Sequence, residues 1–149
     1  MISAPASLTV LVAPGTYHEN IDFQGKAITL VSEQGASSTV IDGGLANPVV
    51  TFKTSEGNSS VLKGFTLQNG KATFAASYTG GGVSISGASP TITENVITKN
   101  QGGCSGIGIG IYFGSPIIQK NTMRFEFYRV HDQLAFVAAI VLSDDGLGI

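Results

Sequence analysis

An internal repeat constrains this chain more than any other feature of its sequence. The segment Ser89-Pro90-Thr91-Ile92-Thr93-Glu94-Asn95 returns as Ser115-Pro116-Ile117-Ile118-Gln119-Lys120-Asn121, and Ile85 and Ile111 precede the two copies in the same register. A looser copy, Val61-Leu62-Lys63-Gly64-Phe65-Thr66-Leu67-Gln68-Asn69, lies upstream. Well-matched cores with variable spacing are typical of solenoids, in which each unit buries its apolar face only against its neighbours.

Each repeat predicts short strands in which apolar and small polar residues alternate. The three sets are Val49–Phe52, Gly82–Ile85 and Gly108–Ile111; Ser60–Lys63, Pro90–Thr93 and Pro116–Gln119; and Phe65–Leu67 and Val96–Thr98. Strands this short are stable only when equivalent strands stack into parallel sheets around one apolar column. We expect the column to contain Val83, Ile85, Ile92, Val96, Ile109, Ile111 and Ile117, with Ile85 stacked on Ile111.

Asn95 and Asn121 occupy the same corner of successive repeats. Asparagine tolerates the left-handed conformation of a sharp turn, and its amide can bond an equivalent amide one repeat away. We therefore predict that both residues form the turn and stack on each other. The alternative is that asparagine stands there only as a common turn residue.

Residues from about Leu8 to Met123 resemble right-handed parallel β-helix proteins of the pectin-lyase-like type. The resemblance rests on Val10–Ile21, on Ile28–Val31 followed by Thr39–Gly43, and on the run from Gly80 to Asn95. It implies an all-β, right-handed parallel β-helix of about four to five rungs and an extracellular or cell-surface location. Lyases, hydrolases, esterases, binding modules and adhesive stalks share this architecture, so the resemblance implies no single activity.

The composition excludes several classes of function. Eight Lys and Arg stand against ten Asp and Glu in 149 residues, which argues against a nucleic-acid partner. The single cysteine, Cys104, leaves no internal disulfide and no Cys-based zinc site. The longest apolar run, Leu134–Leu142, is too short for a membrane span, and Met1–Ser7 has no features of a signal peptide.

The last residues depart from the repeat. Arg124–Val130 stands where another glycine-rich strand is due, and few glycines follow. We therefore divide the chain into a β-helix, residues 1–123, and a tail, residues 124–149. The tail is either a native cap or an unrelated end that follows a truncated array. In both cases we expect it to cover the last rung, and its uniformly apolar run predicts a homo-oligomer formed through residues 124–149.

No group of residues in the sequence is recognisable as a catalytic site. Polysaccharide-cleaving sites need paired carboxylates, but the outward positions Ser84, Ser86, Gly108 and Gly110 carry none. The acidic residues of the repeats are spread over different turns: Glu19, Asp22, Glu33, Asp42, Glu56 and Glu94. Tyr17-His18-Glu19 is interpreted as a solvated turn, and Asp144-Asp145-Gly146 as a turn rather than a metal site. We expect no cofactor and no metal.

Two tyrosines are the candidate binding residues. Tyr112 follows a predicted strand and Tyr78 precedes the next rung, so both can project on one side and stack on sugar rings. The alternative is that Phe113 is core and that the tyrosines only border it. The sequence thus favours a non-catalytic surface or carbohydrate-binding module, a fragment of a longer repeat protein, with polysaccharide as partner. A carbohydrate-active enzyme of the lyase, hydrolase or esterase type stays open.

Overall fold

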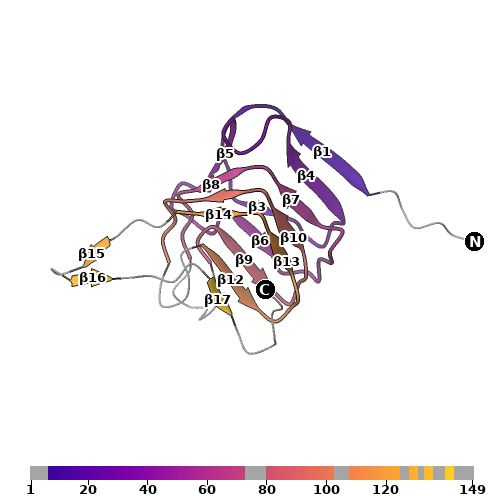
Figure 1. The fold of residues 1–149 in the computed structure, drawn as a ribbon. Helices are drawn as coiled ribbons and strands as arrows, with labels where there is room; N and C mark the ends of the chain where they lie inside the picture. The colour runs from indigo at the N-terminus through magenta and orange to yellow at the C-terminus, as the bar shows by residue number, and fades with distance from the viewer. Residues whose placement is uncertain are drawn as a thin grey trace, which may run out of the picture.

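The fold is a stack of parallel strands in three five-stranded sheets (Figure 1). The computed structural model describes residues 7–72, 80–102 and 108–124, and after them three short strands of the tail. No helix occurs within these ranges. A fourth sheet has only two strands, and they belong to the tail.

Each five-stranded sheet takes one strand from each turn of the chain. The first sheet contains β1 (Leu8–Val12), β4 (Ile28–Ser32), β7 (Val61–Lys63), β10 (Thr91–Thr93) and β13 (Ile117–Gln119). The second contains β2 (Gly15–His18), β5 (Thr39–Asp42), β8 (Thr66–Gln68), β11 (Val96–Ile97) and β14 (Thr122–Met123). The third contains β3 (Ile21–Asp22), β6 (Val50–Phe52), β9 (Val83–Ser86), β12 (Ile109–Tyr112) and β17 (Ile140–Leu142).

This order defines a parallel β-helix of five rungs, at the upper end of the four to five that the repeats predict. Ile85 lies opposite Ile111 and Val83 opposite Ile109, so the predicted register of the third sheet is confirmed. The strands between Val83 and Gln119 pair only in parallel.

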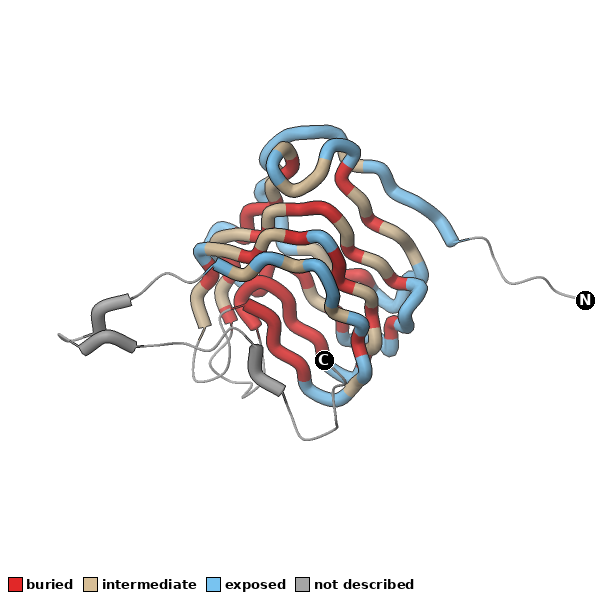
Figure 2. The backbone as a smooth tube through the Cα atoms, viewed as in Figure 1, coloured by how far each residue is buried: buried red, intermediate tan, exposed pale blue. Residues whose placement is uncertain are grey.

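The core is one apolar column enclosed by the three sheets (Figure 2). Phe23 and Phe52 stack within it, with ring centroids 4.3 Å apart. Fully burying one such side chain contributes about 1.5–3 kcal/mol. The buried apolar residues are Phe23, Leu30, Ile41, Val49, Val50, Phe52, Leu62, Phe65, Leu67, Val83, Ile85, Ala88, Ile92, Ile97, Ile109 and Ile111.

Two of the predicted core residues were wrong. Ile117 lies opposite Thr91 on the outer side of the first sheet and is 41% exposed, while Ile118 lies opposite Ile92 and packs against the core. Val96 is only half-buried, because its neighbour Ile97 takes the inward position. Successive side chains of a strand point to opposite faces, so an assignment shifted by one residue exchanges core and surface.

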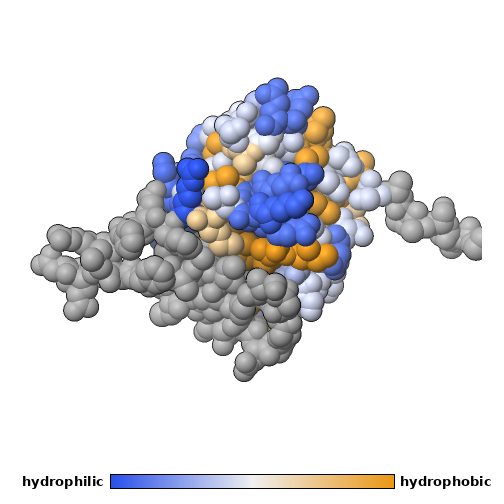
Figure 3. Space-filling view, viewed as in Figure 1, coloured by the Kyte–Doolittle hydropathy of each residue, from blue (hydrophilic) through white to orange (hydrophobic). Residues whose placement is uncertain are grey.

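Some large apolar side chains remain on the surface, next to hydrophilic ones. Figure 3 shows hydrophilic residues over the turn between β13 and β14, with hydrophobic surface beside them. The exposed large apolar residues are Leu8, Val10, Leu11, Leu45, Tyr112, Phe113 and Ile117. Leu8 and Val10 lie on the inward side of the first described rung, which is covered on one side only, whereas Leu11 and Ile117 face outward.

Asn95 and Asn121 stack as predicted, but they are not the residues that make the turn. The left-handed conformation falls on the preceding residues, Glu94 (φ 57°) and Lys120 (φ 54°). The side chain of each asparagine instead bonds backbone of the preceding rung. Asn95 Oδ1 accepts from the Phe65 N–H (3.0 Å), and Asn95 Nδ2 donates to the Leu62 carbonyl (3.0 Å).

The same arrangement recurs at two other places. Asn121 Oδ1 accepts from the Asn95 N–H (3.0 Å), and its Nδ2 donates to the Ile92 carbonyl (2.8 Å). At the next corner Asn100 accepts from the Gly70 N–H (2.8 Å) and donates to the Leu67 carbonyl (3.1 Å). Each of these asparagines therefore satisfies one backbone N–H and adds a second hydrogen bond to a carbonyl where the chain leaves a strand.

We predict that Asn95→Ala lowers the free energy of unfolding by roughly 1–3 kcal/mol, because it leaves the buried Phe65 N–H without its partner. Chemical denaturation of the full chain measures the change. Asn58→Ala, at an exposed turn position, is the control and should change stability by less than about 0.5 kcal/mol. Equal effects of the two substitutions would contradict the role given to Asn95.

The tail contributes one strand to the β-helix. β17 continues the third sheet beside β12, with Ile140 opposite Ile109 and Leu142 opposite Ile111. The strands β15 (Tyr128–Val130) and β16 (Gln133–Ala135) pair with each other in an antiparallel manner. The division at residue 123, like self-association through residues 124–149, stays a prediction. Within the described ranges, no helix is long and apolar enough to cross a membrane.

Candidate functional site

A row of outward side chains runs along the third sheet, one from each of the first four rungs. Tyr112 lies opposite Ser86. Phe52 lies opposite Ile85, which aligns the following Lys53 with Ser86. The Phe23 N–H donates to the Thr51 carbonyl (3.2 Å), which places Gln24 beside Lys53. With about 4.8 Å between rungs, the row Gln24–Lys53–Ser86–Tyr112 is about 14 Å long.

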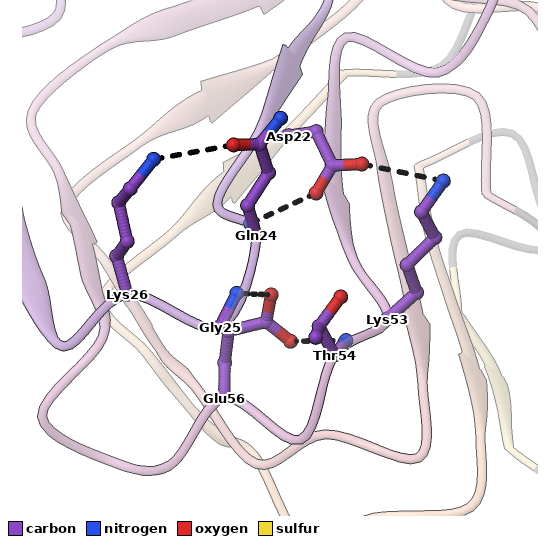
Figure 4. Close-up of polar contacts among 7 residues, drawn as sticks. All are labelled: Asp22, Gln24, Gly25, Lys26, Lys53, Thr54 and Glu56. Atoms are coloured by element: carbon purple, nitrogen blue, oxygen red, sulfur yellow. Dashed lines mark hydrogen bonds and ion pairs between the residues drawn. The ribbon is translucent and has the colours of Figure 1, made fainter.

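Polar contacts fix the first half of this row (Figure 4). Lys53 Nζ lies 3.2 Å from Asp22 Oδ2, and Asp22 Oδ1 accepts from the Gln24 N–H (2.9 Å). Lys26 Nζ donates to Gln24 Oε1 (3.2 Å). Gln24 has a left-handed backbone, which turns the chain here. The side chains are thus linked into one exposed polar network.

Glu56 is a buried residue that joins the turns on which this network lies. Its side chain is buried, Oε1 accepts from the Gly25 N–H (2.9 Å), and Oε2 accepts from the Thr54 N–H (2.8 Å). The backbone carbonyl of Glu56 accepts from the Ser89 N–H (2.6 Å). The carboxylate therefore joins the turn of the first rung to the turn of the second, and its main chain joins the second to the third.

Two aromatic rings end the row. Tyr112 is 41% exposed and Phe113 is 52% exposed, and their ring centroids lie 4.4 Å apart in an edge-to-face arrangement. Phe113 has a left-handed backbone (φ 53°), so the chain turns at once and its ring stays outside the core. The alternative that Phe113 belongs to the core is therefore wrong. Tyr78, the other predicted binding residue, lies outside the described residues, as do Cys104 and Asp144-Asp145-Gly146.

The positions beside this row are not the open surface that alternation predicts. Ser84, Gly108 and Gly110 are buried. Gly80 lies against Gly110 so closely that a Cβ on Gly80 would collide with the Gly110 amide nitrogen. The chain entering β9 therefore crosses the outer side of the sheet, and glycine is needed for this close approach. Ser86 alone of the four predicted outward residues is exposed.

The second sheet carries a separate polar group around Asp42. Asp42 lies opposite His18 on one side and Gln68 on the other. Its Oδ1 accepts from the Gly44 N–H (3.0 Å), and Oδ2 accepts from Gln68 Nε2 (3.0 Å) and Asn69 Nδ2 (2.7 Å). Burial raises the pKa of Asp42, but these hydrogen bonds and the charge of His18 outweigh it, and the pKa lies below its ordinary value.

The other acidic residues are apart from these two groups. Glu94 lies 3.6 Å from Lys63, and Glu19 and Glu33 are exposed at different corners. Tyr17 and His18 lie in β2 rather than in the predicted turn, and the hydroxyl of Tyr17 donates to the Ala13 carbonyl (2.9 Å). Among the described residues, no group of three or more His, Cys, Asp or Glu side chains is arranged to hold a metal ion.

Sequence reasoning missed the row and the buried Glu56. The four residues of the row differ in type and in sequence context. Only the alignment of the rungs in the structure shows that they are neighbours. Glu56 stands in a polar stretch, Lys53–Ser59, that reads as an ordinary loop. Asn100 was detectable, because it follows a strand in the same way as Asn95.

We predict that Asp42 stabilises the fold in a pH-dependent manner. Because its pKa is lower in the folded than in the unfolded chain, its contribution is complete above the unfolded value of about 3.9 and is lost as pH falls through the folded value. Asp42→Asn should cost roughly 1–3 kcal/mol at pH 6, and the difference from wild type should shrink in acid. Denaturant unfolding across this pH range measures it.

Asp22→Asn is the matched control for that series. Asp22 belongs to an ion pair whose side chains are 30% and 60% exposed, so its loss should change stability at pH 6 by less than about 1 kcal/mol. A difference between wild type and Asp42→Asn that is the same in acid and at neutral pH would exclude the role proposed for the Asp42 charge.

The comparisons with known proteins give one family. A family model described as a protein of unknown function (DUF1565) matches residues 22–139. No curated protein and no solved structure matches the chain.

Proposed function

Because the chain belongs to the DUF1565 family, a family of unknown function, we propose its role from the site itself: a non-catalytic carbohydrate-binding module. The observation that carries the proposal is the row Gln24–Lys53–Ser86–Tyr112, which ends in an exposed aromatic pair. An aromatic face buries the apolar face of a sugar ring, and amide, ammonium and hydroxyl groups bond its hydroxyls.

The shape of the row favours an extended polysaccharide over a single sugar. Its four positions follow one straight column because the strands stack in register, and the column is about 14 Å long. The turns below are tied together by Glu56, so the row is ordered before a ligand arrives. A site that is already ordered loses less conformational entropy on binding.

Three of the described carboxylates have partners that suit binding or stability rather than catalysis, and the exposed Glu19 and Glu33 lie at different corners. Asp22 is paired with Lys53, the oxygens of Asp42 are filled by three donors, and Glu56 is buried against two backbone amides. A general acid or base needs an accessible carboxyl group beside the reacting bond, and glycoside hydrolysis needs two. The same row would suit a carbohydrate-active enzyme only as a subsite.

By resemblance to pectin-lyase-like β-helices, the proposal includes an extracellular or cell-surface location, where polysaccharides are encountered. We also propose that the module is part of a longer repeat protein, whose other rungs add binding positions.

We predict that Tyr112→Ala weakens binding to a polysaccharide found by glycan array about tenfold, because the stacking face is lost. Tyr112→Phe keeps that face and should bind within about threefold of wild type. Leu45→Ala, an apolar residue of similar exposure in a loop of the second rung, is the control and should leave affinity unchanged. Isothermal titration calorimetry measures the three affinities. An unchanged affinity of Tyr112→Ala would exclude this site.

We also predict that purified full-length protein does not cleave pectin or polygalacturonate and does not hydrolyse simple acyl esters. Reducing-end, unsaturated-product and ester assays test the three activities. Turnover that survives purification and is lost in Glu19→Ala or Asp42→Ala would favour the enzyme.

A further inference from the structure

Asn69 is the only asparagine of the chain that precedes a glycine. In a flexible chain this dipeptide is chemically reactive. The amide nitrogen of the glycine gives its proton to a base in the solvent and attacks the side-chain carbonyl of the asparagine, because glycine has no Cβ to hinder the approach. A new carbon–nitrogen bond forms, and the side-chain nitrogen leaves as ammonia. Water then opens the cyclic imide to aspartate or isoaspartate.

The fold requires both residues of this dipeptide. Asn69 and Gly70 directly follow β8, the middle strand of the second sheet (Figure 1). Asn69 has a left-handed backbone (φ 53°), which asparagine tolerates better than most residues. A Cβ on Gly70 would collide with the Gly81 carbonyl oxygen, so a larger residue does not fit there. The reactive pair is therefore a consequence of the shape of this corner.

The folded chain holds the two reacting groups apart. The Gly70 N–H donates to Asn100 Oδ1 in the fourth rung (2.8 Å), whereas Asn69 Nδ2 donates to Asp42 Oδ2 in the second rung (2.7 Å). The nucleophile and the side-chain amide are therefore bound to opposite neighbours of the third rung. Asn100 is 2% exposed, and its Nδ2 donates to the Leu67 carbonyl (3.1 Å), which fixes the position of its oxygen.

We propose that Asn69 is a latent deamidation site, which Asn100 keeps unreactive in the folded chain. An N–H that donates to a buried oxygen is shielded from the base that must remove its proton. The reaction therefore requires that the hydrogen bond between Gly70 and Asn100 break and that the Asn69 side chain leave Asp42. The contacts that join the third rung to its neighbours also protect the chain from this modification.

Deamidation would replace a hydrogen bond by a repulsion. Asn69 Nδ2 is one of three donors to the Asp42 carboxylate. An aspartate or isoaspartate at position 69 would bring a second carboxylate to the same oxygen, where the like charges repel. Isoaspartate also adds an atom to the main chain, which displaces Gly70 from its close contact with Gly81. The modified chain should therefore be less stable than the unmodified one.

The test is peptide mapping by mass spectrometry after incubation of the full chain in mildly alkaline buffer. Asn69 should deamidate at least about tenfold more slowly in the folded chain than in the chain unfolded by guanidinium chloride, because it reacts only in molecules that have released the Gly70 N–H. Sodium chloride at equal ionic strength is added to the folded sample. Mapping separates Asn69 from Asp42-Gly43 and Asp145-Gly146, which can form isoaspartate without a change of mass. Equal rates in the folded and the unfolded chain would overturn the proposal.

Asn100→Ala separates the local protection from overall stability. It removes the acceptor of the Gly70 N–H, so Asn69 should deamidate about tenfold faster than in the folded wild type. Asn95→Ala is the matched control, because it removes the same kind of acceptor from the Phe65 N–H and leaves the Gly70 bond in place. Asn69 should react at least about threefold more slowly in this control than in Asn100→Ala.

Circular dichroism verifies that both variants fold. Equal rates at Asn69 in the two folded variants would exclude the role given to Asn100. If Asn100→Ala does not fold, the comparison of folded and unfolded wild type decides the proposal.

Discussion

The fold depends on hydrogen bonds that pass from each rung to the next, at the corners as well as in the strands. A strand of two or three residues, such as β11 or β14, makes too few ladder bonds to hold a fixed position alone. The asparagines supply what is missing, because they bond backbone groups of the preceding rung where the chain turns out of the sheet. No buried side-chain nitrogen or oxygen within the described ranges lacks a partner. Satisfied corners allow strands this short to stay in register.

Register also determines what the surface can do. Because equivalent positions stack, residues that lie far apart in sequence, such as Gln24 and Tyr112, become neighbours in one column. The same rule applied to the second sheet aligns His18, Asp42 and Gln68, but there the contacts consume every oxygen of the carboxylate. One column thus offers exposed groups to a ligand, while the other stabilises the scaffold. The difference arises from the neighbours: Asp42 is surrounded by donors, whereas Lys53 pairs with Asp22 beside its column and remains 60% exposed.

The repeat was sufficient to predict the architecture, because matched copies at similar spacing have few other ways to bury their apolar residues. It was harder to predict which residues of one repeat face the core. Ile117 is as apolar as Ile118, and only its position opposite Thr91 shows that it faces outward. The preference of asparagine for turns assigned the left-handed residue to Asn95 rather than to Glu94. The predicted bond between the Asn95 and Asn121 amides is present (3.1 Å), but the bonds of Asn95 to the backbone of the preceding rung were not predicted. The covered positions Ser84 and Gly110 were unpredictable, since they depend on where the chain crosses the sheet.

The single neighbour of β1 has a consequence for how the molecule opens. In a linear stack each rung is stabilised only by the rungs it touches, so opening begins at an end and moves inward. β1 has one partner, whereas β7 and β10 have two each. Asn95, Asn100 and Asn121 join the third, fourth and fifth rungs by accepting from backbone amides, whereas Asn20 joins the first rung to the second only by donating to carbonyls. Amide protons should therefore exchange with solvent fastest at the first rung and slowest in the middle of the stack. Local unfolding would therefore become less frequent from the first rung towards the middle of the stack, and the rungs would not all open together.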